Sequence, residues 1–190
     1  PTKPPEGFDW DMWVGPRAER PYKFNIAPYK FRWWSDFSSQ MGNWGVHYMD
    51  VIRWLTGETS PIAVSAHGGQ FALNDDRTIP DTMEALFEFA SGMIVQFSIH
   101  EASGGGLINN GEIEFRGTKG NLVTTDNKYK ITPTRPGQFQ DRGTLLEPVD
   151  YKMDVQEDIT FNLIRNFLNC VKDRNEPWCP LEDGHRSTSF

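Results

Sequence analysis

The segment MEALFEFASGMIVQFSIH (Met83–His100) decides the fold class of this chain. Its two halves, Met83–Ala90 and Met93–His100, largely alternate apolar and polar side chains with a period of two, as β-strands do. Ser91-Gly92 lies between the halves and suits a tight hairpin turn. The segment therefore predicts two antiparallel strands that are neighbours in one sheet.

More strands are predicted on both sides of this hairpin. The motif GTKG (Gly117–Gly120) is a second hairpin signal, since a glycine stands at each end of it. Short alternating segments precede the first hairpin and surround the second. These predicted strands are Pro61–Phe71, Gly111–Arg116, Asn121–Thr125 and Lys128–Thr132. Consecutive hairpins are typical of an antiparallel sheet rather than of βαβ units.

The segment GNWGVHYMDVIRWLTG (Gly42–Gly57) has the pattern of a helix. Asn43 suits the N-cap position, and the glycine at position 57 is a good C-terminal stop. The residues that recur at helical spacing are Trp44, His47 or Tyr48, Val51 and Leu55. We therefore expect a helix of about four turns before the first strand.

A second helix is predicted from Asp154 to about Asp173, because Asp154-Val-Gln-Glu157 has the form of a capping box. The residues expected on or near one face of this helix are Ile159, Leu163, Phe167, Cys170 and Val171. A last helix is predicted to begin after Pro180.

Residues 1–40 lack periodicity but are rich in proline and tryptophan, so we expect an ordered loop region held by aromatic packing.

Composition narrows the range of functions. The chain has 190 residues, of which 37% are hydrophobic, and this suits one globular domain. Its net charge of −7, without a basic run, makes nucleic acid and anionic membranes poor partners. The longest apolar runs are too short to cross a bilayer, and the first seven residues do not form a secretory signal. Cys170 and Cys179 form no CxxC motif, which argues against a structural zinc site and a disulfide framework.

His47 is the residue most suited to chemistry. It lies in the opening turns of the predicted helix, after an aromatic loop and beside Gly42 and Gly45, which leave room for a ligand. An imidazole there can transfer a proton near neutral pH, although a helix histidine can equally be a packing residue. His47 and Asp50 could share a helix face, but a third metal ligand is not evident. The chain contains no GxGxxG or GxxxxGK[ST] motif, so its own sequence offers no cradle for a dinucleotide or a nucleoside triphosphate.

Five segments resemble the Gfo/Idh/MocA oxidoreductases, the glucose–fructose oxidoreductase and inositol dehydrogenase family, and most closely its bacterial members. The likeness is in order and covers nearly the whole chain. The tryptophan-rich run that ends in GNWGVHYMDVIRWLTG is its most specific part. The segments are Phe8–Phe24, Phe31–Gly57, Ile79–Gly92, Phe115–Leu122 and Asn166–Thr188.

The resemblance implies an α+β domain with a large, mostly antiparallel sheet, helices on one face and an oligomer interface on the other. In this family such a domain follows a Rossmann domain, which this chain lacks. Residues 1–190 are then a substrate-binding and oligomerisation domain, expected to be a fragment truncated at both ends. NAD or NADP would be bound mainly by the other domain of the parent protein, and none is expected on this chain alone.

The resemblance also implies site residues. Family enzymes transfer a hydride between a nicotinamide and a carbinol carbon of a sugar, cyclitol or related compound, and the histidine of a DxxxH motif moves the hydroxyl proton. His47 occupies the histidine position, but Asn43 stands where the family has aspartate. A neutral amide cannot raise the basicity of an imidazole as a carboxylate would, although it can orient the ring or bind a hydroxyl. The candidates for the substrate wall are Trp10, Trp13, Arg32 and Trp33.

Three functions compete for this chain. The leading one is the substrate half of an NAD(P)-dependent oxidoreductase, with a sugar-like small molecule as its partner and self-association through the sheet face. A second is an NAD-dependent glycosidase of the same family, which product analysis would separate. A third is a non-enzymatic carbohydrate-binding or assembly module, which the asparagine at position 43 favours. The compartment, whether cytoplasmic or exported, is left open.

Overall fold

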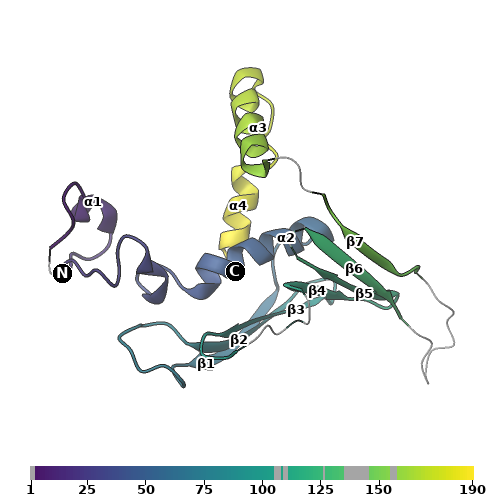
Figure 1. Ribbon diagram of the computed structural model, residues 1–190, viewed down its shortest axis with the longest axis horizontal. Helices are drawn as coiled ribbons and strands as arrows, with labels where there is room; N and C mark the ends of the chain where they lie inside the picture. The colour runs from purple at the N-terminus through teal and green to yellow at the C-terminus, as the bar shows by residue number, and fades with distance from the viewer. Residues whose placement is uncertain (1–2, 105–107, 109–110, 126, 135–145, 155–157) are drawn as a thin grey trace. The chain divides into compact units, whose positions relative to one another are not determined.

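A computed structural model gives the fold, and it describes residues 3–104, 108, 111–125, 127–134, 146–154 and 158–190. The chain forms two compact units (Figure 1). Unit 1 comprises Pro1–Ser103 and Leu181–Phe190, and unit 2 comprises Gly104–Pro180. The described part of the chain contains no helix long and apolar enough to cross a membrane.

Unit 1 is built on an antiparallel sheet of three strands in the order β1-β2-β3. The predicted hairpin is confirmed, since β2 pairs with β3 from Thr82↔His100 to Glu88↔Ile94. Gly92 lies in the turn with φ +86°, a conformation that favours glycine. The strands are β1 (Ala63–Gly69), β2 (Thr82–Glu88) and β3 (Ile94–His100).

Helices cover one face of this sheet. They are α2 (Val46–Thr56) and α4 (Leu181–Thr188), which contact each other. Tyr48 of α2 lies with its ring 6.2 Å from that of Phe97, and Phe190, just beyond α4, lies 5.7 Å from Phe87. The strand residues buried on this face are Ala85, Phe87, Val95 and Ile99. The opposite face carries polar residues, among them Glu84, Gln96, Ser98 and His100.

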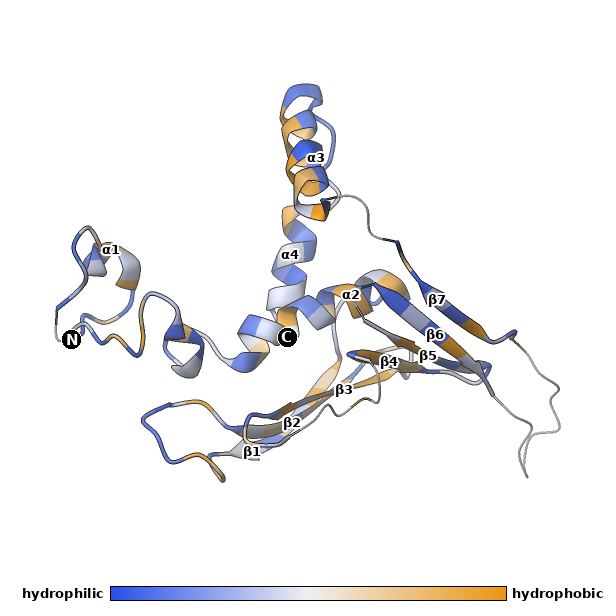
Figure 2. Cartoon of the chain, in the orientation of Figure 1, coloured by the Kyte–Doolittle hydropathy of each residue, from blue (hydrophilic) through white to orange (hydrophobic). Residues whose placement is uncertain are grey.

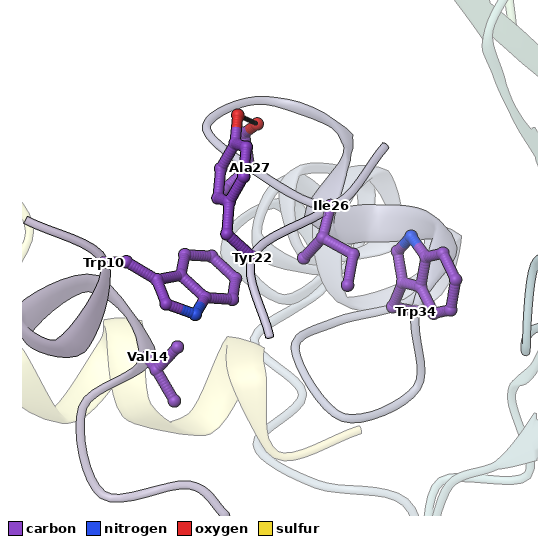
Figure 3. Close-up of a cluster of buried hydrophobic side chains, with 6 residues drawn as sticks. All are labelled: Trp10, Val14, Tyr22, Ile26, Ala27 and Trp34. Atoms are coloured by element: carbon purple, nitrogen blue, oxygen red, sulfur yellow. Dashed lines mark hydrogen bonds between the residues drawn. The ribbon is translucent and has the colours of Figure 1, made fainter. Parts of the chain in front are cut away.

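Residues 3–40 form an ordered region, as predicted. They contain the short helix α1 (Trp10–Val14) and the 3-10 turn η1 (Lys30–Trp33). We call residues 8–37 the aromatic segment, because its core is a cluster of buried apolar side chains (Figure 3). That cluster consists of Trp10, Val14, Tyr22, Ile26, Ala27 and Trp34.

The described residues of unit 2 form a four-stranded antiparallel sheet in the order β4-β5-β6-β7 and one helix. The strands are β4 (Ile113–Arg116), β5 (Gly120–Thr124), β6 (Lys128–Pro133) and β7 (Val149–Lys152), and the helix is α3 (Ile159–Asp173). The GTKG hairpin is confirmed by the pairing of β4 with β5. Strand β7 was not predicted, since its four residues, Val-Asp-Tyr-Lys, are too few to show alternation. The strands thus divide into two antiparallel sheets, within the α+β class that was predicted.

The start of α3 differs from the prediction. The helix begins at Ile159, and Asp158 is its N-cap, with its carboxylate accepting from the backbone N–H groups of Thr160 and Phe161. The capping-box assignment to Asp154 was therefore wrong by about one turn; three of its four residues, 155–157, lie outside the described residues. The helix ends at Asp173, as predicted. Its apolar stripe is visible in Figure 2, yet none of its residues is buried.

Candidate active site

The helix that carries His47 packs against the rest of unit 1 through one buried face. Gly45, Met49 and Ile52 are buried at intervals of four and three residues. The outward side carries Trp44, His47 and Trp54, which are all exposed. The imidazole of His47 lies 6.4 Å from the Trp44 ring at an interplanar angle of 67°. His47 is therefore open to a ligand and is not a core residue.

This arrangement corrects the predicted packing of the helix. Trp44 and Leu55 were expected on the apolar face, but they are 53% and 54% exposed. Trp54 is also exposed, at 80%. The predicted apolar face was based on large aromatic and aliphatic residues, whereas the face that is buried consists of Gly45, Met49 and Ile52.

Asn43 lies in a π-helical turn, Met41–Gly45, that runs directly into α2. Its assignment as N-cap was wrong, because its backbone N–H donates to the Ser39 carbonyl inside the helix. The Ser39 hydroxyl takes the capping role and accepts from the N–H of Gly42 at 2.9 Å. π-helical turns are rare and occur frequently at functional sites. Asn43 therefore lies in the π-helical turn, and His47 lies four residues later in the first turn of α2.

The two glycines beside His47 do not leave open space. A Cβ at Gly45 would lie 2.6 Å from the Met41 sulfur, and one at Gly42 would lie 3.1 Å from the Ser38 hydroxyl. The room expected there for a ligand is therefore occupied by neighbouring side chains. Glycine at position 45 instead lets Met41 pack against the helix.

A buried arginine fastens α2 to α4. Arg53 is 7% exposed and donates to the carbonyls of Thr59 and Asp183 and to the Ser187 hydroxyl. Its guanidinium also forms an ion pair with Asp183 at 3.4 Å. The Ser187 hydroxyl in turn donates to Asp50 at 2.6 Å. Asp50 and Arg53 therefore serve helix packing, and Arg53 also forms an ion pair.

Trp10 and Trp13 are stacked, with ring centroids 5.2 Å apart and an interplanar angle of 11°. Trp10, which belongs to the buried cluster in Figure 3, is 9% exposed. Its indole N–H donates to the Arg20 carbonyl at 2.7 Å. Trp13 is half-buried and lies 4.9 Å from the Phe37 ring. Of the two, only Trp13 has substantial ring surface available for a ligand.

Two guanidinium groups lie close to the Trp33 ring. Arg32 is 4.9 Å from the ring centroid and Arg77 is 4.8 Å from it. Arg77 belongs to the loop between β1 and β2, residues 70–81, and forms a bidentate ion pair with Asp75 at 2.7 Å. This pairing lowers the pKa of the Asp75 carboxyl and raises that of Arg77. No local sequence pattern links Arg77 to Trp33, because the two residues lie 44 positions apart in the chain.

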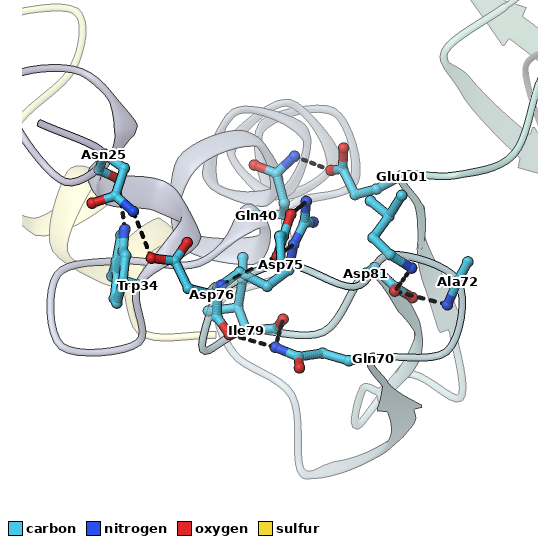
Figure 4. A network of polar contacts seen from close by, with 12 residues as sticks. Asn25, Trp34, Gln40, Gln70, Ala72, Asp75, Asp76, Ile79, Asp81 and Glu101 are labelled. Carbon is cyan, nitrogen blue, oxygen red and sulfur yellow. Dashed lines mark hydrogen bonds and ion pairs between the residues drawn. The ribbon is translucent and has the colours of Figure 1, made fainter.

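Polar contacts fix the β1–β2 loop (Figure 4). Asp81 is fully buried, and its carboxylate accepts from the backbone N–H groups of Phe71, Ala72 and Leu73. The hydrogen bond from the Leu73 N–H contributes most to stabilising the charged carboxylate, and those from Ala72, Phe71 and the Thr82 hydroxyl add to it. The pKa of Asp81 therefore lies well below its usual range.

The same network reaches the start of the helix that carries His47. The Gln40 amide donates to the Glu101 carboxylate, across a separation of 61 residues. Gln40 is 8% exposed, so this contact lies close to the interior of unit 1. It ties the first residue of the helix to the segment that follows β3.

The candidate residues form two groups. Asn43 and His47 lie on the helix, and Trp10, Trp13, Arg32 and Trp33 lie in the aromatic segment. Within the described residues, no hydrogen bond, ion pair or ring contact joins one group to the other. The described part of the chain also contains no cluster of three metal-ligating side chains.

A family comparison matches residues 27–189 to "Oxidoreductase family, C-terminal alpha/beta domain", the C-terminal domain of the Gfo/Idh/MocA proteins. A search of curated protein sequences finds no match to this chain.

Solved structures share the fold. An aldose–aldose oxidoreductase from Caulobacter crescentus complexed with glycerol has a TM-score of 0.61 and 17% identity, over 85% of this chain and 46% of that one. An oxidoreductase from Agrobacterium radiobacter in complex with NAD+, L-tartaric acid and magnesium has a TM-score of 0.57 and 11% identity, over 86% and 47%. An NAD-binding protein from Listeria innocua has a TM-score of 0.56 and 18% identity, over 85% and 46%. The chain therefore spans slightly less than half the length of these relatives.

Proposed function

This chain belongs to the Gfo/Idh/MocA oxidoreductase family, and from that premise we propose that it is the substrate-binding half of an NAD(P)-dependent oxidoreductase. The substrate would be a sugar, a cyclitol or a related alcohol. One observation carries the proposal: His47, at the position of the family's proton-transfer histidine, is exposed on the outward side of α2 beside Trp44. A histidine so placed can be reached by a substrate hydroxyl.

The chain's own residues do not suit a dinucleotide. The sequence contains neither a GxGxxG nor a GxxxxGK[ST] motif, the two glycine-rich signals for a backbone cradle around a pyrophosphate. We propose that NAD or NADP binds in another part of the complete protein, and we assign no hydride-transfer step to these residues.

The proposed role of His47 is proton transfer. Its imidazole would accept the hydroxyl proton of the substrate in the oxidative direction and return it in the reverse direction. Asn43, one turn earlier, would orient the ring or bind a neighbouring hydroxyl through its amide. Trp13, Arg32 and Trp33 would form the substrate wall, and Trp10 would support Trp13 from beneath.

The asparagine at position 43 favours one alternative, a carbohydrate-binding module without catalysis. The two functions differ in what His47 contributes. An oxidoreductase needs proton transfer by His47 for turnover, whereas a binding module would lose at most one ligand contact when His47 is replaced. The NAD-dependent glycosidase alternative would release an aglycone, which product analysis detects.

The test is the replacement His47→Ala in the complete protein, with reduction of NAD+ or NADP+ followed on a panel of sugars and cyclitols. We expect turnover to fall about a hundredfold or more, the usual scale for loss of a general base. His185→Ala is the matched control, because His185 is also an exposed helix histidine of unit 1. Unchanged turnover in His47→Ala would contradict the proposal, as would an equal loss in the control.

We also propose that the polar face of the β1–β2–β3 sheet mediates self-association. His67 and Glu84 are paired across the strands there, and Glu84 accepts from Gln96, Ser98 and His100. A second copy could use such donors and acceptors to form a symmetric contact. Light scattering on Glu84→Arg should then give a smaller mass than the unaltered protein, with Glu58→Arg as the control. A monomer in both proteins at high concentration would contradict this.

A further inference from the structure

A pocket of about 270 Å³ lies where the aromatic segment meets the β1–β2 loop. Trp33 and Trp34 supply its aromatic surface. Its polar lining comes from Asn25 and Lys30 on one side and from Asp75, Asp76 and Arg77 on the other. Neither Asn43 nor His47 lines this pocket, so it is separate from the proposed proton-transfer site and shares only Trp33 with the proposed substrate wall.

Long-range hydrogen bonds join the two walls. The Thr78 N–H donates to the Trp33 carbonyl at 3.0 Å, and the Ser35 N–H donates to the Thr78 hydroxyl at 2.7 Å. The Asn25 amide donates to Asp76 at 2.7 Å, across 51 residues. The Trp34 indole N–H donates to the Asn25 carbonyl at 2.7 Å. The pocket is therefore held by several contacts and not by a single loop conformation.

The charges in the pocket are balanced. Lys30 and Arg77 contribute two positive charges, and Asp75 and Asp76 contribute two negative ones. Arg77 is engaged by Asp75 through its Nε and Nη2 atoms. Asp76 is bound through one carboxylate oxygen, by the Asn25 amide, while Lys30 has no ion pair among the described residues. The Lys30 ammonium, a donor, and the second Asp76 oxygen, an acceptor, are therefore among the groups that can bind a ligand.

This combination selects for hydroxyl groups. A hydroxyl both donates and accepts, so neighbouring hydroxyls can bind an ammonium and a carboxylate together. Because the four charges of the lining cancel, an anionic or a cationic ligand would lose hydration on entering the pocket without gaining a net Coulomb attraction in return. Tryptophan rings add apolar surface for the C–H face of a ring-shaped ligand.

From these contacts we propose that the pocket binds an uncharged saccharide ring through its hydroxyl groups. It provides a saccharide subsite beside Trp33 whose occupation does not require His47. The inference goes beyond the proposed function, because it would hold equally for a catalyst and for a binding module.

The experiment is ¹⁹F NMR on the complete protein labelled with 5-fluorotryptophan, with the Trp33 and Trp34 signals assigned from Trp33→Phe and Trp34→Phe. Four uncharged probes (glucose, galactose, mannose and xylose) are compared with glucuronate and with glucosamine, whose pyranose rings carry a negative and a positive charge. We expect at least one uncharged probe to shift the Trp33 or Trp34 signal in a saturable way. Glucuronate and glucosamine should bind at least about tenfold more weakly, the effect of about 1.4 kcal/mol.

Variants locate the binding. Lys30→Ala and Asp76→Ala should each weaken the response to the uncharged probe about tenfold, since each removes a charged hydrogen-bonding partner. Lys152→Ala and Asp150→Ala, exposed on β7 in unit 2, are the matched controls and should leave it unchanged. Should Asp76→Ala fail to fold, Asp76→Asn removes the charge with little change in size.

The inference is overturned if no uncharged probe shifts either signal, if the charged probes bind as well, or if neither pocket variant weakens binding. His47→Ala should leave the ¹⁹F response unchanged whatever it does to turnover. Failure of this inference can therefore be told apart from failure of the proposed catalytic role.

Discussion

Replacing Arg53 by methionine should destabilise unit 1 strongly, because this side chain joins α2, α4 and the loop after α2. Its guanidinium makes hydrogen bonds of 3.1 Å to the Thr59 carbonyl, 3.0 Å to the Asp183 carbonyl and 2.6 Å to the Ser187 hydroxyl. Methionine preserves much of the aliphatic packing but none of these bonds.

The expected cost follows from these contacts. A hydrogen bond to a charged group contributes about 1.5–3 kcal/mol, and three such bonds would give about 4.5–9 kcal/mol if they were additive. They are not additive, because the Thr59 and Asp183 acceptors lie near the surface and can be rehydrated. We therefore expect the free energy of unfolding to fall by about 2–4 kcal/mol, which lowers the melting temperature by about 4–16 °C at this chain length.

The assay is denaturant unfolding followed by tryptophan fluorescence, since six of the seven tryptophans belong to unit 1. Arg116→Met is the matched control: the Arg116 side chain is 77% exposed and pairs with Glu114 at the surface, so its loss should cost far less than the loss of Arg53. Equal costs for Arg53→Met and Arg116→Met would refute the assignment of Arg53 as the junction between the helices.

Two further predictions concern unit 1. Asp81→Asn should destabilise the β1–β2 loop most near neutral pH. The pKa of Asp81 in the folded protein lies below the unfolded value of about 3.9, so its stabilisation is present above about pH 4 and is lost as the pH falls below it. The denaturation curves of the two proteins should therefore converge in acid. A constant difference from pH 7 to pH 2 would argue against this account. Ser39→Ala should cost about 1 kcal/mol through loss of the helix cap, and hydrogen exchange at the Gly42 amide should accelerate, whereas Ser103→Ala should leave it unchanged.

Hairpins and helix C-termini could be predicted because their signals are local. Ser91-Gly92 and GTKG each mark a turn within a few residues of the strands they join. Gly57 has φ +76° and ends α2, as glycine at this position does in many helices. In each case a short-range conformational requirement determines the residue type.

Helix N-termini and the packing faces were harder to predict. Asn43 and Asp154 are good capping residues by type, yet Ser39 and Asp158 take those roles. Several polar residues near a helix start can compete for one cap, and the tertiary setting decides between them.

The polar links between distant segments could not be predicted at all. Gln40 and Glu101, and Trp33 and Arg77, meet only in the folded chain. A single sequence carries no local pattern for contacts 44 or 61 residues apart. The position of His47 on an exposed helix face agrees with a catalytic role, but its role remains a prediction.

These long-range contacts fix the helix that carries the candidate proton-transfer residues. The helix bearing Asn43 and His47 is held at its first residue by the contact of Gln40 with Glu101, and in its last turn by Arg53. Its buried face fixes its rotation on the sheet, so the outward direction of His47 is set by residues that no ligand would touch. A proton-transfer group needs such fixed placement, because a displacement of about 1 Å can cost about a hundredfold in rate. The supports and the imidazole are separate residues, and therefore loss of stability and loss of proton transfer can be measured in separate variants.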